Sequence, residues 1–189
     1  TYEITAREDI VTPEGTVWFH KGDVVDTFTT GDSVTTSALL QLGKYSIKET
    51  ATQTGFVLDE NTYDFDIEYA GQMIDVVEIK QSYVNERQKL DLQITKTFED
   101  EDKDAYKDVV FGVYSKNDIS LNDKVIIPAD GLVGTLTIDE DGKNIEKLDL
   151  PTGEYYVKEL ETNVGFKLDD EKHDFTFNYD EDTTKPTVT

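Results

Sequence analysis

The stretch GKYSIKETATQTGFVLDENTYDFDIEY, residues 43–69, decides the fold because it recurs 110 residues later as GEYYVKELETNVGFKLDDEKHDFTFNY, residues 153–179. The two copies align without a gap, and twelve of their 27 positions are identical. Self-similarity at a fixed period indicates one structural unit that occurs twice. We therefore expect two homologous domains, residues 1–88 and residues 89–189.

Short runs rich in Val, Ile, Thr, Tyr and Phe fill both copies, and turn clusters such as PEG, KGD and DEDGKN separate them. This pattern predicts strands, and no stretch shows a sustained helical period. Several short strands per 100 or so residues indicate an all-β fold, here two tandem antiparallel β-sandwich domains of the immunoglobulin-like or transthyretin-like kind.

The two copies differ at their ends. A strand-like segment, LDLQITKTF at residues 90–98, opens the second domain and has no counterpart before residue 2 in the first. The first domain closes with VVEIKQSYVNER, residues 76–87, whereas the second stops at KPTVT. We expect a segment of a longer protein, in which the first domain lacks its first strand and the second has a truncated last strand.

Composition excludes several classes of function. With 18 Lys and Arg against 41 Asp and Glu, the formal charge is −23, which would repel nucleic acid and anionic lipid. Cysteine is absent, so thiol nucleophiles, disulfides and cysteine zinc sites are excluded. No run approaches the roughly 18 apolar residues of a membrane helix, so we expect no membrane insertion.

Two glutamates occupy positions on apolar strand faces. Because side chains alternate across a strand, Glu49 shares a face with Tyr45 and Ile47. Glu159 holds the same position in the second copy. The simpler interpretation is a rim position with access to water, but recurrence in both copies favours an inward carboxylate.

A lysine and a carboxamide also fall on apolar faces. Lys96 shares a face with Ile94 and Phe98, and Asn85 shares a face with Tyr83. Burial favours the neutral forms of an amine and of a carboxylic acid. A neutral amine can attack a carboxamide carbon while a neutral acid supplies protons, which would join two strands through an amide and release ammonia.

At this point the sequence resembles a known family. ITKTFE, FGVYSKNDI, GTLTIDEDGK and LPTGEYYVKELETNVGFKLD are similar to segments of the collagen-adhesin B-type, or SpaA-like, domains of Gram-positive surface adhesins and pilins. The resemblance covers essentially the whole chain as two tandem copies. Its most specific element is Gly-x-Tyr-x-(Ile/Val)-x-Glu followed by Gly-Phe, which both copies contain.

The resemblance implies an intramolecular isopeptide bond between a first-strand Lys and a last-strand Asn or Asp, assisted by the Glu of this motif. It assigns the amine to Lys96 and the acid to Glu159 in the second domain, and the acid to Glu49 and the acceptor to Asn85 in the first. The missing lysine would precede Thr1 and the missing acceptor would follow Thr189. Asn178 is no substitute, because its neighbours take the inward face.

Neither the two histidines nor the acidic turns match a known metal-binding motif in sequence. His20 and His173 have no second ligand at metal spacing, and the turn around Gly142 lacks the acidic residues that an EF-hand needs at its ends. We therefore expect no metal and no cofactor.

The sequence thus predicts structural stalk modules of a Gram-positive adhesin or pilin at the extracellular cell wall, with neighbouring repeats as partners. The reaction would be single-turnover self-cross-linking rather than enzyme catalysis. The alternative is a ligand-binding module that contacts a host protein or glycan through the insert around Trp18, although we expect Trp18 to plug the sandwich edge. A glycosidase with paired carboxylates is disfavoured because Glu49 and Glu159 belong to separate domains.

Overall fold

The computed structural model describes residues 1–31, 39–74, 76–99, 103–144 and 146–189. They form two compact units, Thr1–Glu86 (unit 1) and Arg87–Thr189 (unit 2). Gln88, which the sequence analysis assigned to the first domain, is buried in unit 2 against residues 180–185. Within the described residues, no helix has the length and apolar character needed to cross a membrane.

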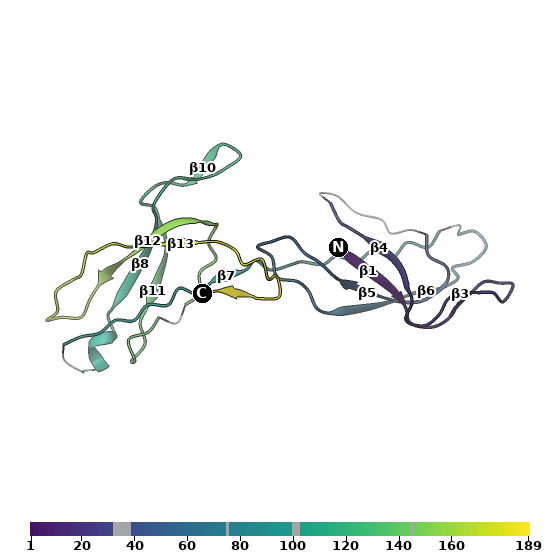
Figure 1. The fold of residues 1–189 in the computed structure, drawn as a ribbon, viewed down its shortest axis with the longest axis horizontal. Coiled ribbons are helices and arrows are strands. Elements are labelled where there is room, and N and C mark those ends of the chain that lie inside the picture. The colour runs from purple at the N-terminus through teal and green to yellow at the C-terminus, as the bar shows by residue number, and fades with distance from the viewer. Residues whose placement is uncertain (32–38, 75, 100–102, 145) are drawn as a thin grey trace. The chain divides into compact units, whose positions relative to one another are not determined.

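Unit 1 is built on one four-stranded antiparallel sheet in the order β4-β1-β5-β6 (Figure 1). The strands are β1 (Tyr2–Ala6), β4 (Val24–Phe28), β5 (Gly43–Glu49) and β6 (Thr62–Ile67), and a hairpin of β2 (Ile10–Val11) and β3 (Val17–Phe19) follows β1. Alternate residues of β1 and β5 are buried, as the period of two requires. The buried core of unit 1 comprises Tyr2, Ile4, Ala6, Ile10, Tyr45 and Ile47.

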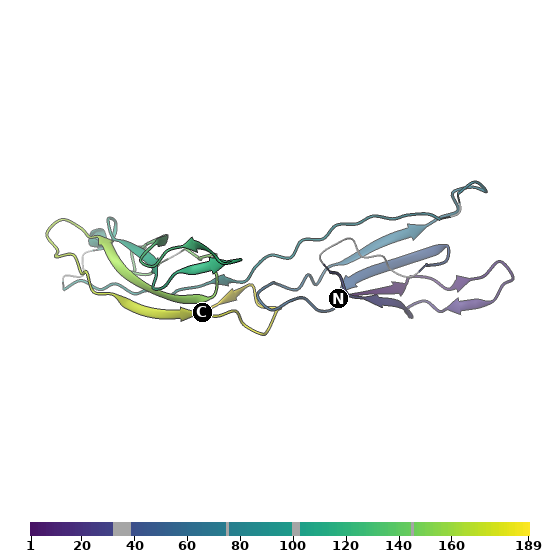
Figure 2. The same ribbon diagram turned by 90° about the horizontal axis from the view of Figure 1, so that it is seen from above.

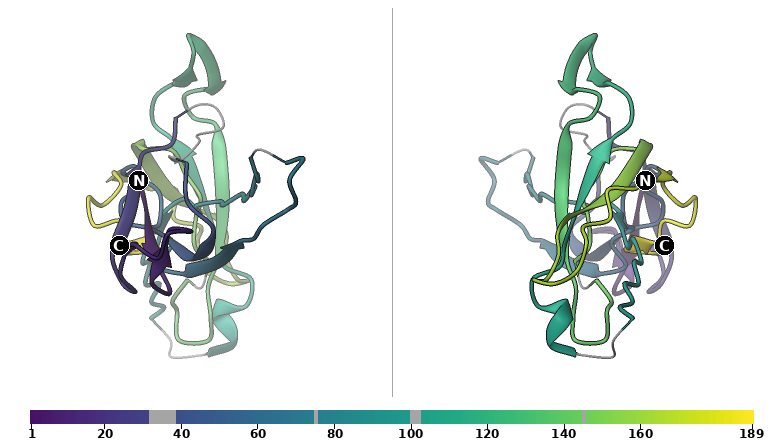
Figure 3. Two further views of the ribbon diagram at one scale, coloured as in Figure 1. Left: turned by 90° about the vertical axis from the view of Figure 1, so that its right-hand side faces the viewer. Right: turned by 90° about the vertical axis from the view of Figure 1, so that its left-hand side faces the viewer.

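Unit 2 repeats this sheet in the order β11-β8-β12-β13. Its strands are β8 (Val110–Ser115), β11 (Leu132–Thr137), β12 (Gly153–Glu161) and β13 (His173–Phe177). A hairpin of β9 (Ile119–Leu121) and β10 (Lys124–Ile127) projects from the sheet (Figure 1 and Figure 3). One short 3-10 helix, η1 (Lys103–Tyr106), precedes β8. The repeated topology confirms the all-β fold and the internal repeat.

A second layer covers the sheet of unit 2. Strand β7 (Lys89–Leu90) pairs in parallel with β14 (Thr187–Val188), and Leu90 also bridges Leu148. These segments bury apolar side chains against the sheet. The resulting core comprises Leu90, Val109, Phe111, Val113, Leu136, Ile138, Leu148, Leu150, Tyr155, Val157 and Phe177.

The predicted strand over residues 90–98 is only partly a strand. The segment is extended and Gln93, Thr95 and Thr97 are exposed, as the alternation predicts. Beyond β7, however, backbone pairing is limited to a bridge at Thr95. The side chain of Asn144 takes the place of a neighbouring strand, because its Oδ1 accepts the Ile94 N–H at 2.6 Å and its Nδ2 donates to Leu92 O at 2.5 Å.

The predicted strand over residues 76–87 has no strand assignment between residues 76 and 86, and Figure 2 draws this part as coil. In unit 2 the equivalent residues form β14, whose ladder partner is β7. Among the residues that the structure describes, none in unit 1 pairs with this stretch as β7 pairs with β14. The backbone of this stretch is held near its end, where Glu86 O accepts the Val57 N–H at 2.8 Å. A strand needs a neighbour for its backbone N–H and C=O groups, and this contact does not extend into a ladder among the described residues.

The expectation that Trp18 plugs the sandwich edge is wrong, because its side chain is 55% exposed. Trp18 lies in β3 next to Phe19, and Phe19 packs against the core of unit 1. Since neighbouring strand residues point to opposite faces, the inward position belongs to Phe19.

Trp18 is the only tryptophan of the chain, so intrinsic tryptophan fluorescence reports on this hairpin alone. We expect acrylamide to quench it nearly as efficiently as free tryptophan in water, because more than half of the side chain is open to solvent. Quenching as weak as that of a core tryptophan would contradict the exposed position.

Tyr155 predicts a pH-dependent stability for unit 2. It is fully buried, its hydroxyl donates to Pro151 O at 2.5 Å, and burial raises its pKa to about 12. The unfolded chain has a tyrosine pKa of about 10. The protonated form therefore stabilises the fold fully below pH 10, and this contribution is lost as the pH rises towards 12.

We expect the unfolding free energy of unit 2 to fall by roughly 2 kcal/mol between about pH 10 and 12 through this group. Guanidinium unfolding followed by near-ultraviolet circular dichroism measures it. Tyr155→Phe should remove this decrease in unfolding free energy between about pH 10 and 12. Tyr69→Phe, at an exposed position, should leave it in place. Identical pH profiles for Tyr155→Phe and the parent would contradict the assignment.

Candidate functional site

Each unit buries one carboxylate at the same place in its sheet. Glu49 ends β5 and is 4% exposed, and Glu159 lies on β12 and is 2% exposed. Glu49 Oε2 accepts the Asp59 N–H at 2.9 Å, and Glu159 Oε2 accepts the Asp169 N–H at 2.8 Å. One oxygen of each carboxylate is thus held by the backbone of the loop that follows its strand.

In unit 2 the second carboxylate oxygen meets an amine. Lys96 Nζ lies 2.9 Å from Glu159 Oε1, and the two side chains are 17% and 0% exposed. Aromatic rings surround the pair on one side: Nζ lies 5.3 Å from the centre of the Phe98 ring, which packs against Phe166 and Tyr106. A weakly polar environment of this kind strengthens the electrostatic interaction between the ammonium and the carboxylate.

The Gly-Phe part of the repeated motif has a structural role beside this pair. Gly55 and Gly165 adopt φ values of +92° and +96°, which favour glycine strongly over other residues. In unit 2 the turn places the Phe166 ring 4.2 Å from that of Phe98, centre to centre. Through Phe166, the motif therefore contributes to the aromatic group beside the Lys96–Glu159 pair.

Gly142 holds the backbone of Lys96. The Lys96 N–H donates to Gly142 O at 2.8 Å, and a Cβ atom on residue 142 would clash with Lys96 O. Gly142 also has a φ of +77°. A side chain at position 142 would therefore displace the strand that carries the amine.

In unit 1 the carboxylate meets a carboxamide instead. Asn85 Nδ2 donates to Glu49 Oε2 at 2.6 Å and to Val57 O at 2.9 Å. The Val57 N–H donates to Glu86 O at 2.8 Å, which fixes the backbone next to Asn85. Unit 1 thus presents an acid and an amide, and unit 2 presents an acid and an amine.

The structure therefore brings the four predicted site residues together in two pairs, Lys96 with Glu159 and Asn85 with Glu49. Asn178 is exposed, as predicted. Sequence reasoning missed Gly142 and the two aspartates whose N–H groups hold the carboxylates. The aspartates had a usable signal, because Leu58-Asp59 and Leu168-Asp169 are identical in both copies.

The expectation that His173 has no neighbouring metal ligand is wrong. Ligand atoms of Asp169, Glu171 and His173 lie within 4.8 Å of one another. All three residues are exposed, and Asp169 Oδ1 already accepts the Glu171 N–H at 3.0 Å. This arrangement does not by itself make a metal site.

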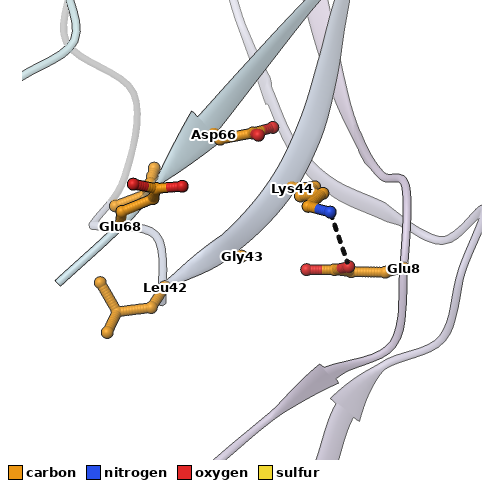
Figure 4. A pocket seen from close by; sticks show the side chains of 7 residues that line it. Glu8, Leu42, Gly43, Lys44, Asp66 and Glu68 are labelled. Carbon is orange, nitrogen blue, oxygen red and sulfur yellow. Dashed lines mark ion pairs between the residues drawn. The ribbon is translucent and has the colours of Figure 1, made fainter.

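A shallow hollow lies at the other end of β5 from Glu49. Figure 4 shows Glu8, Lys44, Asp66 and Glu68 around Gly43, with Lys44 Nζ 3.8 Å from Glu8 Oε2. The hollow is open to solvent, and its charged groups are exposed. It is separate from the buried carboxylate and contributes nothing to its chemistry.

The Lys96–Glu159 pair can be tested by its effect on stability. We expect Lys96→Met or Glu159→Gln alone to destabilise unit 2 by about 3 kcal/mol, because either leaves a buried group without its partner. The double variant should recover part of this loss. Native-state hydrogen exchange of the β8 and β12 amides measures the free energy of opening.

Lys116→Met is the matched control, because Lys116 pairs with Asp174 on the exposed surface. It should change stability by less than about 1 kcal/mol. Additive effects of Lys96→Met and Glu159→Gln would contradict a coupled pair.

Comparison with known proteins places the chain in a family. The SpaA prealbumin-like fold domain matches residues 3–82 and again residues 91–189. Among solved structures, the Bacillus anthracis TIE protein is similar, with 22% identity and a TM-score of 0.42 over 94% of this chain. The chain spans 27% of the length of that protein. No curated protein matches the chain.

Such domains are typical of Gram-positive surface proteins, where they are non-catalytic modules. The two matched regions fall in unit 1 and unit 2 and together cover nearly all of the chain. The chain therefore belongs to the SpaA prealbumin-like domain family, of which it contains two consecutive members.

Proposed function

We propose that the two units are stalk modules of an extracellular Gram-positive surface protein, adhesin or pilin, each closed by an amide bond between its first and last strands. The observation that carries the proposal is that each buried glutamate contacts one of the two reactants. Glu159 contacts the amine of Lys96, and Glu49 contacts the carboxamide of Asn85. Neighbouring repeats of the parent protein are the expected partners.

The first chemical step is a proton transfer within the ion pair. Lys96 Nζ lies 2.9 Å from Glu159 Oε1, so one proton can pass directly from the ammonium to the carboxylate. This leaves a neutral amine and a neutral acid, and no water is needed. The neutral amine then carries the lone pair required to attack a carboxamide carbon.

The second step is the departure of ammonia, for which the contact between Asn85 and Glu49 in unit 1 is the relevant geometry. Asn85 Nδ2, the nitrogen that must leave, lies 2.6 Å from Glu49 Oε2. A protonated glutamate in this place can deliver its proton to Nδ2 as the carbon–nitrogen bond breaks. The bond to the lysine nitrogen replaces the bond to Nδ2, and the lysine nitrogen gives its surplus proton back to the glutamate as the amide forms. The departing ammonia takes this proton and leaves as ammonium, which regenerates the carboxylate.

The benefit of such a bond is mechanical and thermodynamic. It would join the two ends of a domain of about 100 residues, and closing a loop of that length stabilises a fold by roughly 4 to 5 kcal/mol in the chain-entropy model for disulfides. An amide achieves this without cysteine, which the chain lacks, and without an oxidant. Tension along the chain would act on a covalent bond rather than on backbone hydrogen bonds.

The experiment supplies unit 2 with an acceptor. Thr189 is equivalent to Ile79, so adding KQSYVNER, the sequence of residues 80–87, after Thr189 puts an asparagine at position 195, equivalent to Asn85. We expect the denatured intact mass of this extended chain to be about 17 Da below the sequence mass, because one ammonia leaves.

Lys96→Met and Glu159→Gln should each restore the full mass. Lys158→Met is the matched control, since Lys158 lies on β12 with its amine over the ring of Tyr114, away from Glu159, and should keep the deficit. A full mass in the extended parent chain would overturn the proposed cross-link.

A second function is supported by the exposed hairpin of unit 1. The hairpin carries three exposed apolar residues, Trp18, Val11 and Val17, and Val24 of β4 is exposed as well. Exposed aromatic and aliphatic groups of this kind mark protein-binding surfaces. In this alternative the module contacts a host extracellular protein or a glycan.

Binding of the chain to immobilised extracellular-matrix proteins and glycans tests the alternative. Trp18→Ser should abolish binding, and Tyr69→Ser, at an exposed site outside the hairpin, should leave it unchanged. Equal binding by both variants would exclude the hairpin as the contact surface.

A further inference from the structure

Four aromatic rings of unit 1 form a continuous row that the proposed chemistry does not use. The row runs from Phe28 through Tyr2 and Tyr83 to Tyr63, and successive ring centres lie 5.8, 5.4 and 4.8 Å apart. Phe28, Tyr2 and Tyr63 belong to β4, β1 and β6, whereas Tyr83 belongs to the last stretch of the unit, which has no strand assignment. The row therefore connects the sheet to that stretch.

Tyr83 is one of the few side chains that hold this last stretch in place. Within residues 76–86, all of which the structure describes, only Val77, Tyr83 and Asn85 are not exposed. Tyr83 packs against the core of unit 1. Because the stretch has no backbone ladder, its attachment depends in large part on these side chains. A covalent bond at Tyr83 would therefore strengthen the unit where backbone pairing is absent.

Tyr63 and Tyr83 form the closest pair of the row. Their ring centres lie 4.8 Å apart and the ring planes meet at 43°. Aromatic pairs in proteins usually have centres about 4.5 to 7 Å apart, so this pair is at the short end of the range. Two phenol rings joined directly by a carbon–carbon bond have centres only slightly closer than this and are also twisted relative to each other. The pair is therefore close to the geometry of dityrosine.

Asp59 can accept the phenol proton of Tyr63. The Tyr63 hydroxyl donates to Asp59 Oδ2 at 2.7 Å, and Asp59 Oδ1 accepts the Asn61 N–H at 3.0 Å, which fixes the carboxylate. This hydrogen bond raises the pKa of Tyr63 and lowers the pKa of Asp59, so at neutral pH the phenol keeps its proton and the carboxylate is ionised. A phenol that loses an electron becomes a strong acid, and its proton can pass directly to Asp59.

The two tyrosines differ in their access to solvent. Tyr63 is 36% exposed, so a dissolved oxidant can reach it, whereas Tyr83 is half-buried. The Tyr83 hydroxyl donates to Gln81 Oε1, and burial raises the pKa of Tyr83 to about 12. Both rings are therefore protonated phenols at neutral pH. Because the rings are in contact, oxidation at Tyr63 can be followed by electron transfer from Tyr83.

We propose that Tyr63 and Tyr83 are a site of oxidative modification, at which a haem peroxidase with hydrogen peroxide joins the two rings as dityrosine. Each phenol gives up one electron and one proton, and the hydrogen peroxide takes both electrons and both protons to become two waters. A carbon–carbon bond then forms between the two ortho carbons, and the hydrogens on these carbons move to the oxygens and restore the phenols. The modification uses neither Glu49 nor Asn85, so it does not depend on the proposed amide.

Treatment of the full chain with a haem peroxidase and hydrogen peroxide, at low protein concentration, tests the proposal. We expect a monomer with the blue fluorescence of dityrosine and a denatured mass lowered by about 2 Da, because two hydrogen atoms leave. Trypsin cleaves after Lys48, Lys80 and Arg87, which places Tyr63 in the peptide 49–80 and Tyr83 in the peptide 81–87. The digest should contain these two peptides joined to each other.

Three substitutions assign the site. Tyr63→Phe and Tyr83→Phe should each abolish the joined peptides, because either removes one of the two phenols. Asp59→Asn removes the proton acceptor at nearly constant volume and should slow the coupling at least about tenfold. A rate in Asp59→Asn equal to that of the parent would overturn the role of Asp59.

Two matched controls should behave as the parent. Tyr69 is 65% exposed and lies in the same tryptic peptide as Tyr63, so Tyr69→Phe tests whether exposure alone selects the reactive ring. Tyr114 and Tyr156 form a pair in unit 2 with centres 5.1 Å apart and nearly parallel planes, at 9°. Tyr114→Phe tests whether any tyrosine pair suffices. Protection of the β5 amides from hydrogen exchange verifies that each variant is folded.

The bond should also change the stability of unit 1 alone. It closes a loop of about 20 residues, so the β5 and β6 amides of the oxidised chain should exchange at least about tenfold more slowly than those of the untreated chain. The β8 and β12 amides of unit 2 serve as the internal reference and should exchange at the same rate in both.

Several results would overturn the site. One is a parent chain that yields no joined peptides. Another is joining through Tyr69, or covalent dimers in place of the modified monomer, because either would mean that exposure rather than pairing selects the ring. Coupling that persists in Tyr63→Phe or Tyr83→Phe would have the same meaning.

Discussion

A carboxylate buried in an apolar core is the constraint around which each unit is arranged. Glu49 and Glu159 replace what would otherwise be apolar side chains at the ends of central strands, and a buried carboxylate is tolerated only when it has partners. One partner is common to both units, the backbone N–H of the aspartate ten residues later. The other is the amine of Lys96 or the amide of Asn85, the groups that we propose react. In unit 2 the loop after β12 holds the carboxylate, and the rings of Phe98 and Phe166 pack beside the amine.

The sequence was sufficient for the features that depend on alternation and repetition. Tyr45 and Tyr155 identify the inward face in both copies, and the alternation from them reaches Glu49 and Glu159. The same argument from Ile94 and Phe98 places Lys96. Each inference needs only neighbours within one strand, because a period of two leaves no freedom once one inward residue is known.

What could not be predicted depends on contacts between residues far apart in the chain. Asn144 satisfies the backbone at Leu92 and Ile94 with its side chain, about 50 residues away in sequence. Gln88 would ordinarily be assigned to a polar linker, and its burial is visible only once residues 180–185 are in place. The expectation that Trp18 is buried fails for a related reason, because Phe19 fills the inward position of the hairpin.

The parallel pairing of β7 with β14 has a consequence for how unit 2 resists extension. Because the chain enters along the first of these strands and leaves along the second, in the same direction, a pull on both ends slides the strands past each other. Sliding loads the hydrogen bonds of the pair at once, whereas peeling would break them one after another. The parallel pair is therefore the shear-bearing element of unit 2. The amide that we propose would join the continuations of these same two strands.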